Sequence, residues 1–319
     1  MIKPIAMRDV FLRKIHSSME QDSSIFFISA DFGSPVLDDI RADYPDRFVN
    51  VGIAEQNLIN VTAGLALEGF KVFAYAIAPF ITMRCFEQLR VNLALLSEVR
   101  EINVNLIGVG AGYSYVVSGP THQCYEDITL IRSLPNFKIF SPSDHVSTEG
   151  VFAQCINDKG PKYLRLDAQV LPTLRDSASK SLIDNGFELL QDYGSDGIIV
   201  ATGYMVHTAL KVVSDLREKG IFFSVIDLIN LTDFSFDKLN SILKDIPFIF
   251  SLEEGFQGRG GLDSILRNCL SDAELNNKFY GIGVKPEYSF DLGTRQELHE
   301  KVGIGERIVT NRILSILGQ

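Results

Sequence analysis

Residues 51–75 read VGIAEQNLINVTAGLALEGFKVFAY, and this stretch indicates the fold. Apolar residues recur at helical spacing over residues 54–67, and the short apolar run over residues 72–75 is typical of a buried strand. The same alternation of helix and strand continues on both sides. Such alternation predicts a mostly parallel sheet with helices on both faces, so the expected fold class is α/β with a doubly wound sheet.

Two series of alternating elements follow from this pattern. In the first, further strands are expected at residues 25–29, 104–109 and 138–140, and further helices at residues 7–19, 81–96 and 146–156. In the second, strands are expected at residues 197–201, 222–227 and 248–252, and helices at residues 206–219, 236–243 and 262–270. The polar stretch at residues 173–184 is the expected linker. We therefore expect two domains, residues 1–172 and the smaller residues 185–319.

Composition and charge exclude several classes of protein. The 319 residues include 40 acidic and 30 basic side chains, which give a net charge of -10. Because no basic surplus is available to neutralise phosphates, we expect no nucleic-acid partner and no anionic membrane surface. No window approaches the roughly 18 uninterrupted apolar residues of a membrane span, and the N-terminus does not resemble a signal peptide. The expected location is the cytoplasm.

The densest polar segment is SGPTHQCYED at residues 118–127, which follows an expected strand. In a doubly wound sheet, ligands bind beyond the carboxyl ends of strands, where such a loop would lie. His122 is placed in a Gly-Pro turn, where a neutral imidazole can donate, accept or shuttle a proton near pH 7. A loop histidine bound only to the backbone is the alternative, and both interpretations are open from local context.

Glu55 is expected in the first turn of a largely apolar helix, where a carboxylate is favoured by the helix dipole. Such a group either caps the backbone or meets a ligand that needs an anion. The glycines of residues 108–112 do not fit a dinucleotide loop, since the third comes one residue too early. Four distant cysteines without a C-x-x-C pair are expected as small buried side chains rather than zinc ligands.

These segments belong to an ordered set of motifs that covers nearly the whole chain. Its members are SAD at 29–31, GIAEQN at 52–57, AGLA at 63–66, GPTHQ at 119–123, RSLPN at 132–136, PSD at 142–144, ATG at 201–203 and EEG at 253–255. Between them lie Phe80, Arg84, Phe86, Gln88, Arg90 and Asn92 in an F-x-x-x-R-x-F-x-Q-x-R-x-N pattern. In order and spacing the set resembles the C-terminal half of transketolase and its short, split relatives.

The resemblance implies a domain that binds the pyrimidine ring of thiamine diphosphate, followed by the family's C-terminal domain. The family's G-D-G motif, which holds the diphosphate through Mg2+, does not occur in this sequence. The resemblance therefore implies an N-terminal partner subunit with a G-D-G…N motif, which supplies Mg2+. It also implies a homodimer of this chain, completed to a heterotetramer, and a sugar substrate from which a two-carbon ketol unit is transferred.

Individual residues take roles from the same resemblance. Glu55 matches the glutamate that hydrogen-bonds a pyrimidine nitrogen, and Phe80 and Phe86 match the aromatic pocket around that ring. Asp31 matches a residue near the thiazolium ring, while His122 matches one that touches the oxygens of the bound sugar. Glu55 and His122 are thus the expected catalytic residues.

The sequence also departs from the family pattern at substrate contacts. Ser118 stands where transketolases have an aspartate, and Gly110 and Ala168 stand where they have a histidine and a phosphate-binding arginine. Arg8 and Arg165 remain as candidate anion contacts. These departures suggest an atypical sugar, either non-phosphorylated or linked to a nucleotide.

Other interpretations of the same two domains are open at this stage. The β subunit of a 2-oxoacid dehydrogenase shares both domains and also needs a partner, although the GPTHQ and RSLPN motifs resemble transketolase more closely. Deoxyxylulose-phosphate synthase is a further enzyme alternative. A scaffold subunit that lost catalysis is the non-enzyme alternative, against which the presence of Glu55 argues.

Overall fold

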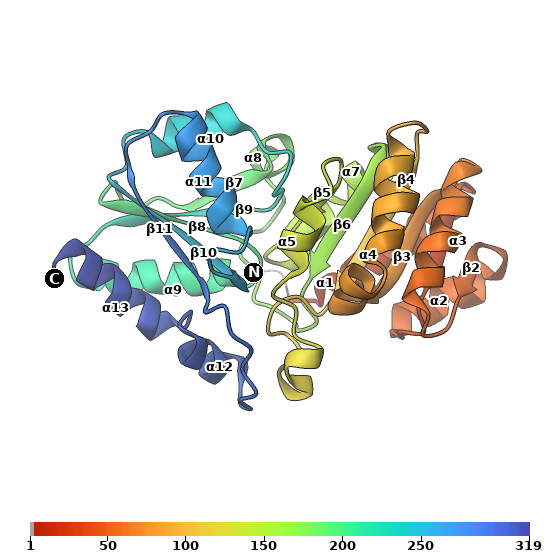
Figure 1. Cartoon of the computed structure of the whole chain (residues 1–319), viewed down its shortest axis with the longest axis horizontal. Coiled ribbons are helices and arrows are strands. Elements are labelled where there is room, and N and C mark those ends of the chain that lie inside the picture. Colours follow the sequence, from red (N-terminus) through yellow and green to blue (C-terminus); the bar gives the residue numbers. More distant parts are fainter. Residues whose placement is uncertain (1–2) are drawn as a thin grey trace. The chain divides into compact units, whose positions relative to one another are not determined.

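The computed structural model describes residues 3–319, which form two compact units (Figure 1). The first unit contains residues 3–111, Leu130–Phe140 and Asp144–Ala178. The second contains Gly112–Thr129, Ser141–Ser143 and Ser179–Gln319. The polar loop around His122 therefore belongs with the C-terminal part of the chain, although it follows a strand of the first unit.

A six-stranded parallel sheet forms the core of the first unit, in the order β2-β1-β3-β4-β6-β5. Its strands are β1 (Ile25–Ser29), β2 (Phe48–Asn50), β3 (Lys71–Ile77), β4 (Asn103–Val109), β5 (Lys138–Phe140) and β6 (Gly160–Leu166). All seven residues of β4 are buried, as expected for a central strand covered on both faces. The expected α/β class with a mostly parallel sheet is confirmed.

Helices of several kinds connect these strands. The α-helices are α1 (Met7–Gln21), α2 (Pro35–Asp43), α3 (Glu55–Leu67), α4 (Phe86–Gln88), α5 (Asp127–Arg132), α6 (His145–Gly150) and α7 (Phe152–Asn157). Short 3-10 helices lie at η1 (Pro45–Arg47) and η4 (Val116–Thr121). Ser34 caps α2 by accepting a hydrogen bond from the Leu37 N–H, and Pro35 occupies the first turn, where no donor is needed.

The prediction of one continuous helix over residues 81–96 is wrong in detail. The segment forms two π-helical stretches, η2 (Phe80–Arg84) and η3 (Leu89–Leu95), on either side of α4. The Thr82 hydroxyl donates to the Ala78 carbonyl at 2.7 Å, and the Cys85 thiol donates to the Ile81 carbonyl at 2.8 Å. Side-chain donors thus compete with the backbone for these carbonyls, which favours the wider π turn, a feature frequent at functional sites.

The second unit is built on a five-stranded sheet in the order β11-β10-β8-β9-β7, parallel except for β7. Its strands are β7 (Phe187–Gln191), β8 (Gly197–Ala201), β9 (Phe223–Leu228), β10 (Phe248–Phe256) and β11 (Lys278–Val284). Its helices are α8 (Lys180–Asn185), α9 (Met205–Glu218), α10 (Phe236–Leu243), α11 (Leu262–Asp272), α12 (Arg295–Val302) and α13 (Glu306–Leu317). Helix α8 begins inside the stretch that the sequence suggests as a linker.

Candidate functional site

Glu55 is the first residue of α3 and is 5% exposed. Its Oε1 atom accepts a hydrogen bond from Nη1 of Arg84 at 3.0 Å. The Arg84 side chain is 48% exposed, so a buried carboxylate is here paired with a guanidinium that reaches water. The start of the helix favours an anion at Glu55. Because this carboxylate is buried, it needs a hydrogen-bond donor, which is Arg84 in this structure.

Phe80 completes this cluster. The guanidinium carbon of Arg84 lies 3.8 Å from the centroid of the Phe80 ring, so Arg84 stacks on Phe80 while it donates to Glu55. A flat, donating group therefore fits between the aromatic ring and the carboxylate. The expected aromatic partner Phe86 lies on α4, where it lines a cleft with Arg90 and Leu134.

Cys85 lies beside this cluster but is not a nucleophile. Burial raises the pKa of its thiol to about 12, and the negative charge of Glu55 adds to the effect. The thiol therefore stays protonated at neutral pH. All four cysteines of the chain are buried, as the sequence predicts.

Asp31 follows β1 in the left-handed region, with φ +50°. Its N–H donates to Oδ1 of Asn50 at 3.1 Å, and Nδ2 of Asn50 donates back to the Asp31 carboxylate at 2.9 Å. The same Asn50 Oδ1 accepts from the Gly52 N–H at 2.9 Å, in the turn that leads into α3. Asn50 thus joins the ends of β1 and β2 and holds the turn before Glu55, a role that sequence reasoning missed.

Arg8 lies on α1, where its Nε donates to Oδ1 of Asp9 at 2.8 Å. Its charge is therefore already engaged by a neighbouring carboxylate. Arg165, the other candidate anion contact, is buried within β6. In the first unit the structure thus links Phe80 to Glu55 through Arg84, whereas the contacts described for Asp31, Phe86 and Arg8 are with other residues.

Ser118 and His122 lie together in the second unit, on the loop Gly112–Thr129. Gly119, with φ +67°, turns the chain between them. The Thr121 hydroxyl donates to the Ser118 carbonyl at 3.2 Å and is 3.0 Å from Nδ1 of His122. Because the hydroxyl proton is donated to Ser118, the hydroxyl oxygen can accept a hydrogen bond from Nδ1. In the neutral ring with its proton on Nδ1, Nε2 is the acceptor.

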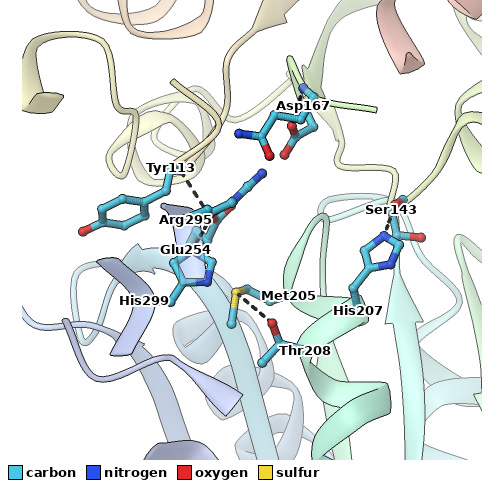
Figure 2. Close-up of polar contacts among 10 residues, drawn as sticks. Tyr113, Ser143, Asp167, Met205, His207, Thr208, Glu254, Arg295 and His299 are labelled. Carbon is cyan, nitrogen blue, oxygen red and sulfur yellow. Dashed lines mark hydrogen bonds and ion pairs between the residues drawn. The ribbon is translucent and has the colours of Figure 1, made fainter. Parts of the chain in front are cut away.

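A buried ionic cluster that sequence reasoning missed lies in the same unit (Figure 2). Glu254, on β10, accepts from Nε and Nη2 of Arg295 at 2.9 and 2.7 Å, and from Nε2 of His299 at 2.7 Å. Arg295 also stacks on the ring of Tyr204, 3.6 Å from its centroid. Burial alone would raise the pKa of Glu254, but the charge of Arg295 and the hydrogen bond from His299 outweigh it and hold the pKa well below its usual value.

The sequence carried two signals for this cluster. EEG at residues 253–255 ends a strongly apolar strand, where a carboxylate requires a partner. Arg295 and His299 are four residues apart on one helix, so they face the same side. Neither signal identifies the other, because β10 and α12 are separated by about forty residues of chain.

The PSD motif at residues 142–144 has a structural role. Asp144 and Ser147 form a reciprocal capping box at the start of α6. The Ser143 hydroxyl donates to Asp227, and the Ser143 carbonyl pairs with Nε2 of His207 at 2.7 Å (Figure 2). The capping box lies within the first unit, and the contacts of Ser143 lie within the second.

Within residues 3–319, no group of three or more histidine, cysteine or acidic side chains is arranged to hold a metal ion. Over the same residues, no helix is long and apolar enough to cross a membrane. Of the residues that the sequence singles out, Glu55 and Phe80 belong to the first unit, and Ser118 and His122 belong to the second.

Comparison with known families matches two domains to the chain. Residues 3–173 match the family described as "Transketolase, pyrimidine binding domain", and residues 187–309 match "Transketolase, C-terminal domain". Glu55 lies in the first matched region. His122 also lies there by sequence, although it packs with the second compact unit.

Two curated relatives and one solved structure are similar over nearly the whole chain. One of the subunits of the apulose-4-phosphate transketolase of Phocaeicola vulgatus is 29% identical over 314 residues, which are 98% of each protein. A 1-deoxy-D-xylulose-5-phosphate synthase of Synechococcus sp. is also 29% identical over 98% of this chain, but over only 48% of that enzyme. A structure described as "Split gene transketolase, inactive beta4 tetramer" is 28% identical, covers 98% of both chains and superposes with a TM-score of 0.84. The chain therefore belongs to the transketolase family, of which it comprises the pyrimidine-binding and C-terminal domains.

Proposed function

We propose that the chain is the C-terminal subunit of a split, thiamine diphosphate-dependent transketolase that transfers a two-carbon ketol unit between sugars. The contact of Arg84 with both Glu55 and Phe80 is the observation that carries this proposal. It indicates that the two side chains together accept a flat group that stacks on one and donates N–H to the other. An aminopyrimidine ring has the same properties, so the residues present fit the cofactor.

Thiamine diphosphate, when bound, supplies a carbon nucleophile from its thiazolium ring. The task of this chain is to bind the pyrimidine end and to control protons there. Glu55 would hydrogen-bond a pyrimidine nitrogen and favour the imino tautomer, and its low-dielectric surroundings strengthen that interaction. The Arg84 side chain would be displaced from Glu55 and Phe80 by the pyrimidine ring, and because that side chain is half-exposed it can move into solvent. Phe86 and Asp31 would complete the walls of the cofactor site.

His122 and Ser118 would contact the sugar. The acceptor at Nε2 of His122 suits a sugar hydroxyl, and the Ser118 hydroxyl replaces the aspartate that transketolases use there. With Gly110 and Ala168 also replacing family contacts, we propose a sugar that is non-phosphorylated or nucleotide-linked, with Arg8 as a further anion contact. We propose the cytoplasm as the place of the reaction.

A second subunit completes the enzyme in this proposal. It would carry the G-D-G…N motif and hold Mg2+ and the diphosphate, and two copies of each chain would form a heterotetramer around a homodimer of this one. The similarity to a protein that is itself named as one subunit of a transketolase supports a divided enzyme. It favours ketol transfer over the 2-oxoacid dehydrogenase alternative and over a scaffold without activity.

Replacement of Glu55 and of His122 should have different effects in the reconstituted two-subunit complex. Glu55→Gln keeps the size of the side chain but not its charge, so hydrogen–deuterium exchange at the thiazolium carbon should slow by about 10²–10⁴-fold. His122→Ala should leave that exchange unchanged, and should lower turnover and raise the KM for the ketose donor. Glu68→Gln, beyond the exposed end of α3, is the matched control.

Exchange in Glu55→Gln at the wild-type rate would refute the assignment of the cofactor site. A loss of exchange in His122→Ala would place that residue at the cofactor instead of the sugar. A panel of phosphorylated, free and nucleotide-linked ketoses, tested on the wild-type complex, identifies the donor class.

A further inference from the structure

The loop Gly112–Thr129, which carries Ser118 and His122, is held closed at its base. The N–H of Gly112 donates to the Cys124 carbonyl and the N–H of Cys124 donates to the Gly112 carbonyl, each at 3.0 Å. This pair of hydrogen bonds joins the two arms of the loop at its base, and His122 lies between them in sequence.

Glu254 contacts this base directly. Its Oε1 accepts from the N–H of Tyr113 at 3.2 Å. At Gly112, whose φ is +56°, a Cβ atom would lie 2.0 Å from Oε2 of Glu254, so only glycine allows the backbone to approach the carboxylate this closely. The backbone at Gly112 and Tyr113 is thus packed against the buried side chain of Glu254 from β10.

The orientation of Glu254 is itself fixed. Arg295 binds both carboxylate oxygens and His299 binds Oε1 (Figure 2). Stacking on the ring of Tyr204 also holds the guanidinium. Rotation of the carboxylate would break several charge-assisted hydrogen bonds in a dry environment, each stronger than a neutral one. These hydrogen bonds therefore hold the Glu254 carboxylate in one orientation against the loop.

A second anchor holds the other end of the loop. The hydroxyl of Tyr288, in the segment between β11 and α12, donates to Oε1 of Glu126 at 2.9 Å. The ring of neighbouring Tyr125 packs on the rings of Phe256 and Tyr113, with distances of 5.0 and 4.9 Å between ring centroids. The two anchors come from different parts of the C-terminal unit and meet the loop on either side of His122 in sequence.

We propose that Glu254 and Tyr288 are positioning residues for the substrate, which act through the loop rather than by touching the sugar. Glu254 sets the orientation of His122 from the Tyr113 end, and Tyr288 sets it from the Glu126 end. This inference rests on the proposed contact of His122 with the sugar, and it gives the C-terminal domain a part in substrate binding.

Amide hydrogen exchange of the full chain, followed by mass spectrometry, tests the anchors without any activity. Peptides from residues 112–129 should exchange faster in Glu254→Gln and in Tyr288→Phe, by about 2- to 10-fold for the single hydrogen bond lost in the latter. Tyr288 is 59% exposed, so Tyr288→Phe should fold even if Glu254→Gln does not. Tyr193→Phe, whose ring contacts Arg217 instead of the loop, is the control.

Kinetics of the two-subunit complex, with the non-phosphorylated ketose xylulose as the probe donor, test the effect on substrate. Tyr288→Phe should raise the KM for the donor by about 2- to 10-fold, while thiazolium exchange keeps the wild-type rate. Unchanged loop exchange, or faster loop exchange with an unchanged KM, would overturn the proposal. Failure of the proposed function would differ, because the wild-type complex would then transfer no ketol unit from any ketose while the difference in loop exchange persists.

Discussion

At the scale of single residues, Glu254 combines full burial with a charge that three donors compensate. Arg295 and His299 offset the cost of removing the carboxylate from water, and the backbone of Tyr113 uses its remaining capacity. Removal of one charged partner from such a cluster destabilises the fold strongly, because the opposite charge then stays buried without a counter-charge.

Glu254→Gln should lower the free energy of unfolding at pH 7 by about 3–5 kcal/mol, because Arg295 then lacks its counter-charge. The pKa of Glu254 is lowered from its ordinary value of 4.5 in the folded state, so its stabilising effect is complete above that value. This stabilising effect is lost as the pH falls below 4.5, because the Glu254 carboxylate of the unfolded chain binds a proton at a higher pH than that of the folded chain. Urea unfolding followed by circular dichroism should therefore show a difference between variant and wild type that shrinks below pH 4.5. A constant difference, or an equal loss in the exposed Glu101→Gln control, would contradict this.

At the scale of elements, β6 carries a buried cation into the parallel sheet. Nζ of Lys162 donates to Oδ1 of Asn103 on the adjacent strand β4 at 3.2 Å, and to the carbonyls of Asp158 and Gly160 at 2.7 and 2.9 Å. The lysine thereby joins the start of β6 to that of its neighbour. Burial lowers the pKa of Lys162 to about 8.

The stability of the wild-type chain relative to Lys162→Met should rise as the pH increases from 8 to 10.5. In this window the unfolded lysine still binds its proton while the folded one releases it, so a higher pH favours folding. Thermal unfolding of both proteins across this range measures the difference, and the variant corrects for tyrosine and cysteine titration. A flat difference would mean that Lys162 stays charged when buried.

At the scale of the whole molecule, we propose that residues 3–319 bind one end of the cofactor and that a partner subunit binds the other. The cluster of Glu55 and Phe80 suits a pyrimidine ring, whereas residues 3–319 offer no arrangement of acidic and histidine side chains for Mg2+. Most of the affinity for a diphosphate comes from charge and metal coordination.

The isolated chain should therefore bind thiamine diphosphate weakly, with or without Mg2+. Titration calorimetry of the chain alone, and of the chain with its proposed partner, compares the two states directly. Micromolar, Mg2+-dependent binding by the chain alone would contradict the division of the site between subunits.

Local sequence determined much of the fold and part of the site. Strands β1 and β4 and helix α3 follow from apolar periodicity, which is a property of neighbouring residues. Glu55 and His122 stand out by their residue type at a helix start and in a Gly-Pro turn. Short or interrupted strands do not: β2 has three residues, and β6 begins with Gly160 and Pro161, so their pairing depends on the sheet that receives them.

Only the tertiary structure decided which residues surround these groups. The π-helical turns that bring Arg84 and Phe80 to Glu55 depend on competition for carbonyls within one segment. The cluster around Glu254 joins segments near residues 113, 204, 254 and 295, and no local pattern links them. Buried charges are stable only where distant partners meet them, so their positions are set by the packing of the folded chain rather than by the neighbours in sequence.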